Sequence, residues 1–200
     1  MIAVIDYGMG NLRSVEKAFQ HLGFEAAITD RPADLAAASH LVLPGDAAFG
    51  DAMRKLRDQG WEEAIRREVE RGKPFLGICV GLQLMFATSE EMGLHAGLGL
   101  LPGRSVRFPA GERVPQIGWN QADLQRSCDL LEGVPDASFF YFVHSYYVVT
   151  VDETDCVATT EYGLAYTSIA ARDNLYGVQF HPEKSQQVGL RLLRNFAVMS

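Results

Sequence analysis

The chain has 200 residues, a length that suits one ordinary domain with a sizeable hydrophobic core. Hydrophobic residues make up 48% of it and charged residues 22%, which excludes intrinsic disorder and collagen-like repeats. The formal net charge of −7 argues against a general nucleic-acid binder, because such proteins bind a phosphate backbone with an excess of Lys and Arg.

The cysteine content and the hydropathy pattern predict a compartment. Three cysteines cannot all pair within one chain, so free thiols are expected rather than a disulfide framework. The first residues lack the basic region and the small-residue cleavage site of a secretion signal. No stretch reaches the roughly 20 apolar residues that span a bilayer. We therefore expect a reduced, soluble, cytoplasmic protein that does not enter a membrane.

The first half of the chain alternates apolar strands with amphipathic helices. Strands are expected at 1–6, 40–43 and 74–79, and helical spacing of apolar residues at 12–22, 49–71 and 82–86. Strands that are apolar throughout and alternate with helices are typical of a parallel sheet covered on both faces.

The second half, from about Gly97, has a different texture. Short segments rich in Val, Phe, Tyr and Thr are separated by Gly, Pro and Asp turns and predict strands, many of them antiparallel. These strands are expected at 105–108, 139–144, 147–151, 165–171 and 175–180, and a last helix at 188–198. Because no linker or repeat separates the halves, residues 1–200 are predicted to form one α/β domain. Its sheet is open, mixed and largely parallel, with helices on both faces.

A candidate nucleophile lies where the strand at 74–79 passes into a helix. Gly77-Ile78-Cys79-Val80-Gly81 has the G-x-nucleophile-x-G form of a nucleophile elbow, with Cys in place of Ser. A thiol at a helix N-terminus lies near free N–H donors and a partial positive charge, which favour the thiolate. The alternative is an inert buried cysteine between two packing glycines. On this motif alone both interpretations stay open.

A cysteine nucleophile needs a base, and His181 is the candidate. It directly follows the apolar strand at 175–180, and the carboxyl ends of parallel strands gather at one edge of a sheet. Glu183 is close enough in sequence to hold the imidazole tautomer. The competing interpretation of His181-x-Glu183 is a zinc deaminase, which requires a C-x-x-C pair that the sequence lacks. No metal is therefore expected.

Backbone N–H groups beside the nucleophile are candidates for an oxyanion hole. Val80, directly after Cys79, supplies one donor. A second could come from Pro44-Gly45-Asp46-Ala47, which ends the strand at 40–43; the alternative is that Pro-Gly marks only a turn.

Two glycines after the first strand invite a dinucleotide interpretation that fails. Gly8-x-Gly10 lacks the third glycine of the fingerprint, because Arg13 stands in its place. No P-loop is present either, so no nucleotide cofactor is expected.

Together, the cysteine elbow, Phe180-His181-Pro182-Glu183 and the Pro44-Gly45 loop resemble a class I, triad-type glutamine amidotransferase, whose fold is related to flavodoxin. Further stretches are similar to the glutaminase subunits of imidazole glycerol phosphate synthases, a family of histidine biosynthesis. These stretches are 6–12, 48–53, 118–120, 141–146 and 181–185. The resemblance covers Ile2 to Phe196.

The resemblance implies a reaction and a partner. Cys79 would attack the side-chain amide of L-glutamine, His181 would shuttle the proton and Glu183 would orient His181, with a γ-glutamyl thioester as intermediate. No cofactor is implied. Ammonia would pass to a (β/α)8-barrel cyclase in a heterodimer, which makes imidazole glycerol phosphate and aminoimidazole carboxamide ribotide. In that family the glutaminase is weak until the cyclase binds its phosphoribulosyl substrate.

The resemblance also implies the binding residues. Positions that match the family's glutamine site are Gly45, Val80, Gln83, Glu91, Ser145 and Tyr146, with Gln83 and Glu91 expected on the helix after the nucleophile. The oxyanion loop would consist of Asp46, Ala47 and Val80. The cyclase-facing residues would be Asn11, Trp119, Tyr141 and Lys184.

The sequence departs from the family pattern at two positions. Ala47 replaces the second glycine of Pro-Gly-x-Gly, which would cost of order 1 kcal/mol if the active loop needs a positive φ there. Gln116 stands where a histidine is common before Gly-Trp-Asn, which changes a hydrogen-bond donor. Cys128 and Cys156 match nothing functional.

Two alternatives to this assignment remain. One is the glutaminase of another ammonia-channelling synthase, such as the pyridoxal phosphate synthase. The other is a flavodoxin-like binding or regulatory module in which Cys79 is only a redox sensor.

Overall fold

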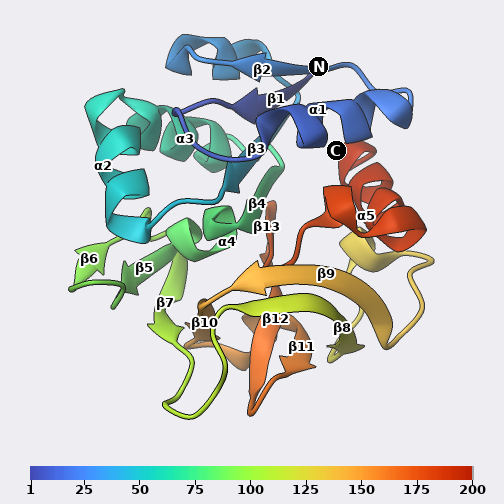
Figure 1. Cartoon of the computed structure of the whole chain (residues 1–200). Helices are drawn as coiled ribbons and strands as arrows, with labels where there is room; N and C mark the ends of the chain where they lie inside the picture. The colour runs from blue at the N-terminus through green and yellow to red at the C-terminus, as the bar shows by residue number, and fades with distance from the viewer. Residues whose placement is uncertain (200) are drawn as a thin grey trace.

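The computed structural model of the chain describes residues 1–199. A twisted, mixed β-sheet runs through the molecule, and helices flank its N-terminal part (Figure 1). The parallel part has the order β2-β1-β3-β4-β13. Its strands are β2 (Ala26–Thr29), β1 (Ile2–Ile5), β3 (His40–Gly45), β4 (Phe75–Cys79) and β13 (Leu175–Val178).

The sheet continues beyond β13 with mostly antiparallel strands. The order is β12-β10-β7-β5-β6, in which only β5 and β7 pair in parallel. These strands are β12 (Ala165–Arg172), β10 (Tyr146–Thr150), β7 (Leu101–Arg107), β5 (Phe86–Ser89) and β6 (His95–Ala96). A branch of three strands leaves β12 through β11 (Cys156–Glu161), β8 (Gln116–Leu124) and β9 (Ser138–His144).

Five α-helices divide between the two faces of the parallel part. They are α1 (Leu12–His21), α2 (Phe49–Asp58), α3 (Trp61–Glu70), α4 (Val80–Met85) and α5 (Gln186–Ala197). Helices α1 and α5 pack on one face, and α2, α3 and α4 pack on the other. Short 3-10 turns lie at η1 (Pro32–Ala37), η2 (Asp129–Leu131), η3 (Glu153–Asp155) and η4 (Pro182–Lys184).

The hydrophobic core has two layers because side chains alternate along each strand. On β1, Ile2 and Val4 join α1 and α5 in one layer, whereas Ala3 and Ile5 join α2 and α3 in the other. All four residues are buried, which explains why this strand is apolar throughout.

The predicted fold class is confirmed, and most predicted elements are present within a few residues. The helix expected over 49–71 is wrong in one respect: Gly60, at φ 78°, interrupts it and separates α2 from α3. The short strand β6, which contains His95, was not predicted. Strands β2, β5, β8 and β11 were not predicted. No helix in residues 1–199 is long and apolar enough to cross a bilayer.

The close crossing of α4 over β3 depends on Gly81. A Cβ at Gly81 would collide with the Leu43 carbonyl of β3, and a Cβ at Gly77 would lie 2.6 Å from the Gly81 oxygen. The two glycines of the elbow therefore let α4 begin directly after β4.

Replacing Gly81 with alanine is expected to destabilise the fold. Forcing this crossing apart costs about 1–3 kcal/mol, and each 1 kcal/mol lowers Tm by about 2–4 °C in a chain of this size. Thermal unfolding followed by circular dichroism measures the change. An unaltered Tm would show that α4 does not need this close contact.

Candidate active site

The order of the strands in the sheet brings the two candidate catalytic residues to one edge. Cys79 is the last residue of β4, and β13, which pairs with β4 in parallel, leads to His181. On the other side of β4, Gly45 at the end of β3 is in register with Cys79. Because β3, β4 and β13 are neighbours in the sheet, the Pro44–Ala47 loop, Cys79 and His181 lie close together.

Cys79 lies in a strained backbone conformation. Its φ of 56° and ψ of −111° belong to a region that L-residues rarely adopt. The side chain is 3% exposed, with Sγ 3.7 Å from the Val143 carbonyl oxygen and 3.9 Å from Gln179 Nε2. This sharp turn between strand and helix is the conformation of a nucleophile elbow.

His181 is held by Glu183. The imidazole Nδ1 lies 2.9 Å from Glu183 Oε1, and both side chains are buried. Because a carboxylate accepts this bond, Nδ1 carries the proton and Nε2 is left for Cys79. Among the described residues, Glu183 Oε2 has no partner, so this carboxylate acts on His181 alone.

The charge of His181 follows from these neighbours. Burial lowers the pKa of the imidazole, but the Cys79 sulfur and the Glu183 carboxylate outweigh it and raise the pKa to about 10. At neutral pH the imidazolium is therefore favoured. In this state His181 can donate a proton, and a positive charge beside a cysteine favours attack by its sulfur.

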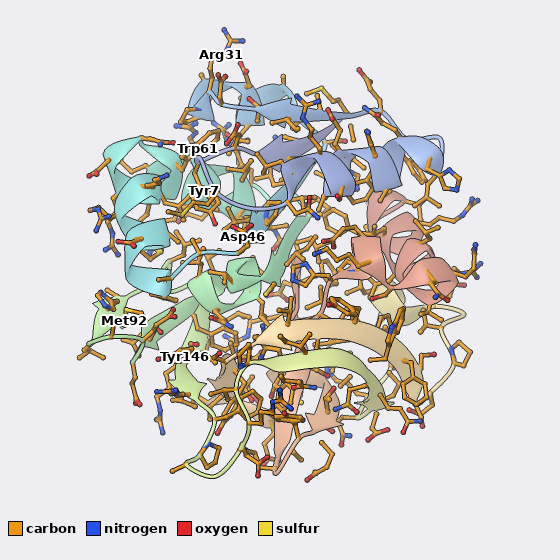
Figure 2. The ribbon with its side chains drawn as sticks, viewed as in Figure 1. Tyr7, Arg31, Asp46, Trp61, Met92 and Tyr146 are labelled. Atoms are coloured by element: carbon orange, nitrogen blue, oxygen red, sulfur yellow. The ribbon has the colours of Figure 1, made fainter. Side chains whose placement is uncertain are left out.

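Cys79 and His181 open into one cavity of about 290 Å³, close to the lower limit for small-molecule sites. Its wall contains most of the predicted site residues, together with four that were not predicted. The predicted ones are Asp46, Ala47, Cys79, Val80, Gln83, Glu91, Ser145, Tyr146 and His181; the others are Ala48, Pro115, Val143 and His144. Asp46 and Tyr146, labelled in Figure 2, come from the upper and lower halves of the molecule in that view.

The Pro44–Ala47 loop is fixed by two hydrogen bonds from the segment that follows β1. The buried Tyr7 hydroxyl donates to the Pro44 carbonyl (3.0 Å), and the Gly10 N–H donates to Asp46 Oδ1 (2.8 Å). Burial, with the charges of Asp46 and Cys79, raises the pKa of Tyr7, so the hydroxyl keeps its proton. Ala47 is absent from the positive-φ residues of the described chain, so this loop conformation holds an alanine there without left-handed strain.

Comparisons with known proteins agree with this geometry. The model of the glutamine amidotransferase class-I family matches residues 3–199. The chain belongs to this family.

Relatives within the amidotransferase family identify the subunit that this chain resembles. The imidazole glycerol phosphate synthase subunit HisH of Desulfitobacterium hafniense is 52% identical over 196 residues, covering 98% of this chain and 93% of the relative. HisH of Syntrophotalea carbinolica is 54% identical over 206 residues and is covered completely. The resemblance to this subunit family is therefore confirmed. The solved structure of PurLQS from Thermotoga maritima, at 19% identity, shares the fold, with a TM-score of 0.78 and coverage of 98% and 96%.

Two predicted glutamine-binding residues of the amidotransferase lie on different elements. Gln83 is on α4, where its Nε2 donates to the Tyr146 carbonyl (2.9 Å). Glu91 is not on that helix, so its predicted placement is wrong. Helix α4 ends at Met85, β5 follows, and Glu91 lies in the next turn, where Oε2 accepts the Phe49 N–H at the start of α2 (2.7 Å). That bond brings Glu91 to the cavity wall.

Gly45 and Glu183 support the amidotransferase site without lining its cavity. A Cβ at Gly45 would come within 2.9 Å of both the Tyr7 hydroxyl and Val80 Cβ, so only glycine fits beside the elbow. Glu183 lies behind His181.

The predicted partner-facing residues fall on β8, β9, the segment after β13 and the turn before α1. Trp119 and Tyr141 are register partners whose rings meet edge-on at 6.0 Å. Trp119 is 46% exposed, and its neighbours Ile117 and Phe139 are 63% and 53% exposed. Asn11 precedes α1, which packs beside η4, and η4 contains Lys184.

Gln179 is a site residue that sequence analysis missed. Its amide lies between Cys79 and Gln83, with Oε1 3.3 Å from Gln83 Nε2. A polar side chain near the end of the otherwise apolar segment before His181 was the available signal, since a buried polar group needs partners.

Proposed function

We propose that this amidotransferase is the glutaminase subunit of an imidazole glycerol phosphate synthase in histidine biosynthesis. It hydrolyses L-glutamine to glutamate and ammonia and passes the ammonia to a cyclase subunit. The observation that carries the proposal is the strained Cys79, which lines one cavity with His181, itself held by Glu183. The HisH relatives supply the pathway.

The first half of the reaction forms a thioester. The Cys79 thiolate attacks the side-chain amide carbon of glutamine, and the C=O electrons move to oxygen. We assign the stabilisation of this oxyanion to the N–H groups of Val80 and of the loop after Gly45, because Val80, Asp46 and Ala47 line the cavity. The His181 imidazolium then gives its proton to the amide nitrogen, the C–N bond breaks and ammonia leaves.

The second half releases glutamate. Neutral His181 takes a proton from water, whose oxygen attacks the thioester carbon. The C–S bond breaks, and Cys79 returns as the thiolate. Glu183 keeps the Nδ1–H tautomer throughout and stabilises the imidazolium.

The partner is a (β/α)8-barrel cyclase that docks on the apolar surface around Trp119. This surface exposes three large apolar side chains, those of Ile117, Trp119 and Phe139. Exposed apolar patches mark sites of interaction with other proteins. Tyr141, in contact with Trp119, belongs to the same strand as His144 of the cavity wall. A heterodimer formed there would receive ammonia close to where it is released. The cytoplasmic location is part of this proposal, supported by three cysteines that are all free.

Glutamate release is the direct test. It is measured for the chain alone, with a barrel cyclase added, and with the cyclase and its nucleotide substrate. We expect weak release from the chain alone and a strong increase with both additions. No release in any condition, with Cys79 intact, would overturn the glutaminase. Activation only by a different barrel protein would keep the glutaminase and reject the histidine pathway.

A further inference from the structure

Three buried polar side chains form a line from β8 to the cavity wall, where the last of them, His144, lies beside Ser145 and Tyr146. Tyr166 Oη on β12 lies 2.9 Å from Gln116 Oε1 on β8 and 3.1 Å from His144 Nε2 at the end of β9. His144 Nδ1 lies 2.8 Å from the Tyr146 carbonyl oxygen. The proton transfers at Cys79 use none of these side chains.

The direction of each hydrogen bond follows from the number of protons. The Tyr146 carbonyl can only accept, so His144 carries its proton on Nδ1. Burial and the neighbouring His181 lower the pKa of His144 to about 4, although the bond to Tyr146 opposes this change. The ring is therefore neutral, and Nε2 is an acceptor.

The tyrosine has one proton to give. Burial raises the pKa of the Tyr166 hydroxyl, so it stays protonated and donates to His144 Nε2. The structure places Gln116 Oε1 beside Tyr166 Oη at 2.9 Å, and because Tyr166 gives its single proton to His144, we assign the rotated Gln116 amide, with its NH₂ group facing Tyr166. The chain of donors runs from Gln116 through Tyr166 and His144 to the Tyr146 carbonyl.

The Tyr146 carbonyl accepts two donors, one from each side. His144 Nδ1 approaches at 2.8 Å and Gln83 Nε2 at 2.9 Å, which together use both lone pairs of the oxygen. The His144 ring is in turn held by Phe108 and Phe142, with centroid distances of 5.3 and 5.7 Å. The peptide plane at the cavity wall is therefore fixed by a buried network.

We propose that Gln116 and Tyr166 are positioning residues that act through His144 to orient the Tyr146 peptide and thereby set the affinity for glutamine. The proposal rests on the proposed function because it takes glutamine as the substrate. The network fixes the peptide before substrate arrives, and we assign the peptide the same contribution to binding in the ground state and in the transition state. Loss of such uniform binding raises KM and leaves kcat unchanged.

The test compares two tyrosine variants in the complex with the cyclase. Tyr166→Phe keeps the ring and removes the hydroxyl. We expect KM for glutamine to rise about five- to tenfold, the effect of one lost buried hydrogen bond, with kcat within about twofold. The matched control is Tyr162→Phe, which removes a surface hydroxyl that donates to the Arg113 carbonyl (2.7 Å). Its KM should equal that of the wild type.

A second variant and a spectroscopic measurement keep the test decisive if Tyr166→Phe folds poorly. Gln116→Glu places an acceptor-only group opposite Tyr166, diverts its proton from His144 and should also raise KM. Nitrogen-15 NMR of the histidine side chains should show His144 as the Nδ1–H tautomer at neutral pH, with Nε2–H appearing in Gln116→Glu, where the Tyr166 oxygen becomes an acceptor for it.

Three results would overturn the proposal while leaving the glutaminase intact. They are an unchanged KM in both network variants, a fall in kcat at constant KM, and an Nε2–H tautomer or imidazolium at His144 in the wild type. Failure of the glutaminase itself would appear separately, as the absence of glutamate release from the wild-type complex.

Discussion

Cys79→Ala is expected to abolish glutamine-dependent synthesis by the complex while leaving ammonia-dependent synthesis intact. The sulfur is the only group proposed to bond to the substrate, so its removal should lower glutamine hydrolysis by at least about 10⁴-fold. The cyclase would still accept free ammonia, because its own site is unchanged. The measurement is product formation with glutamine and, separately, with an ammonium salt at alkaline pH.

The alanine variant also tests whether Cys79 is structural. The side chain is buried, yet its removal takes away one sulfur from a turn whose shape depends on Gly77 and Gly81. The Tm of Cys79→Ala should therefore remain near that of the wild type. Loss of both syntheses together would mean that Cys79 supports the fold or the subunit contact rather than the chemistry.

Substitution of the other two triad members is expected to give unequal losses. His181→Ala removes the proton donor and should lower kcat by roughly 10⁴–10⁶-fold. Glu183→Gln keeps the shape but replaces the carboxylate that orients and charges His181, and should cost roughly 10²–10⁴-fold. Equal losses would contradict the assignment of base and orienting residue.

Glu183→Gln should also shift the dependence of kcat/KM on pH. In the wild type the pKa of His181 is about 10, so the imidazolium persists through neutral pH. Without the carboxylate this pKa falls, and the basic limb of the profile of kcat/KM against pH should move to lower pH. A basic limb unchanged from the wild type would show that Glu183 does not interact with the titrating pair.

The raised pKa of His181 also makes the stability of the fold depend on pH. A histidine whose folded pKa is raised contributes stability that is fully present below its unfolded pKa of about 6.5. That contribution is lost as the pH rises through about 10. The Glu183→Gln variant should therefore lose less stability over this pH range than the wild type does.

Much of the site was predictable because it lies at strand ends. The apolar segments before Cys79 and His181 mark two parallel strands, and parallel strands bring their carboxyl ends to one edge. The elbow glycines were equally informative, since only glycine allows α4 to cross β3 so closely. Local sequence therefore predicted that the candidate nucleophile, its candidate base and the loop beside them lie together.

Other parts depend on contacts that no local pattern reveals. Glu91 reaches the cavity from a turn because it accepts the Phe49 N–H of a distant helix. Strand β8 was missed because Gly118, Asn120 and Gln121 interrupt its apolar pattern, although its pairing with β9 creates the surface around Trp119. Tyr166 joins the site through His144, a residue of another strand. Long-range pairing decides each of these positions.

Detection of the acyl-enzyme would identify the nucleophile. The wild-type complex is mixed with glutamine, quenched in acid within its first turnovers, and digested for mass spectrometry. We expect one γ-glutamyl group on the peptide that carries Cys79, lost on treatment with hydroxylamine and absent from Cys79→Ala. Steady glutamine hydrolysis with the group on another residue, or with full activity in Cys79→Ala, would contradict the assignment of Cys79 as the nucleophile.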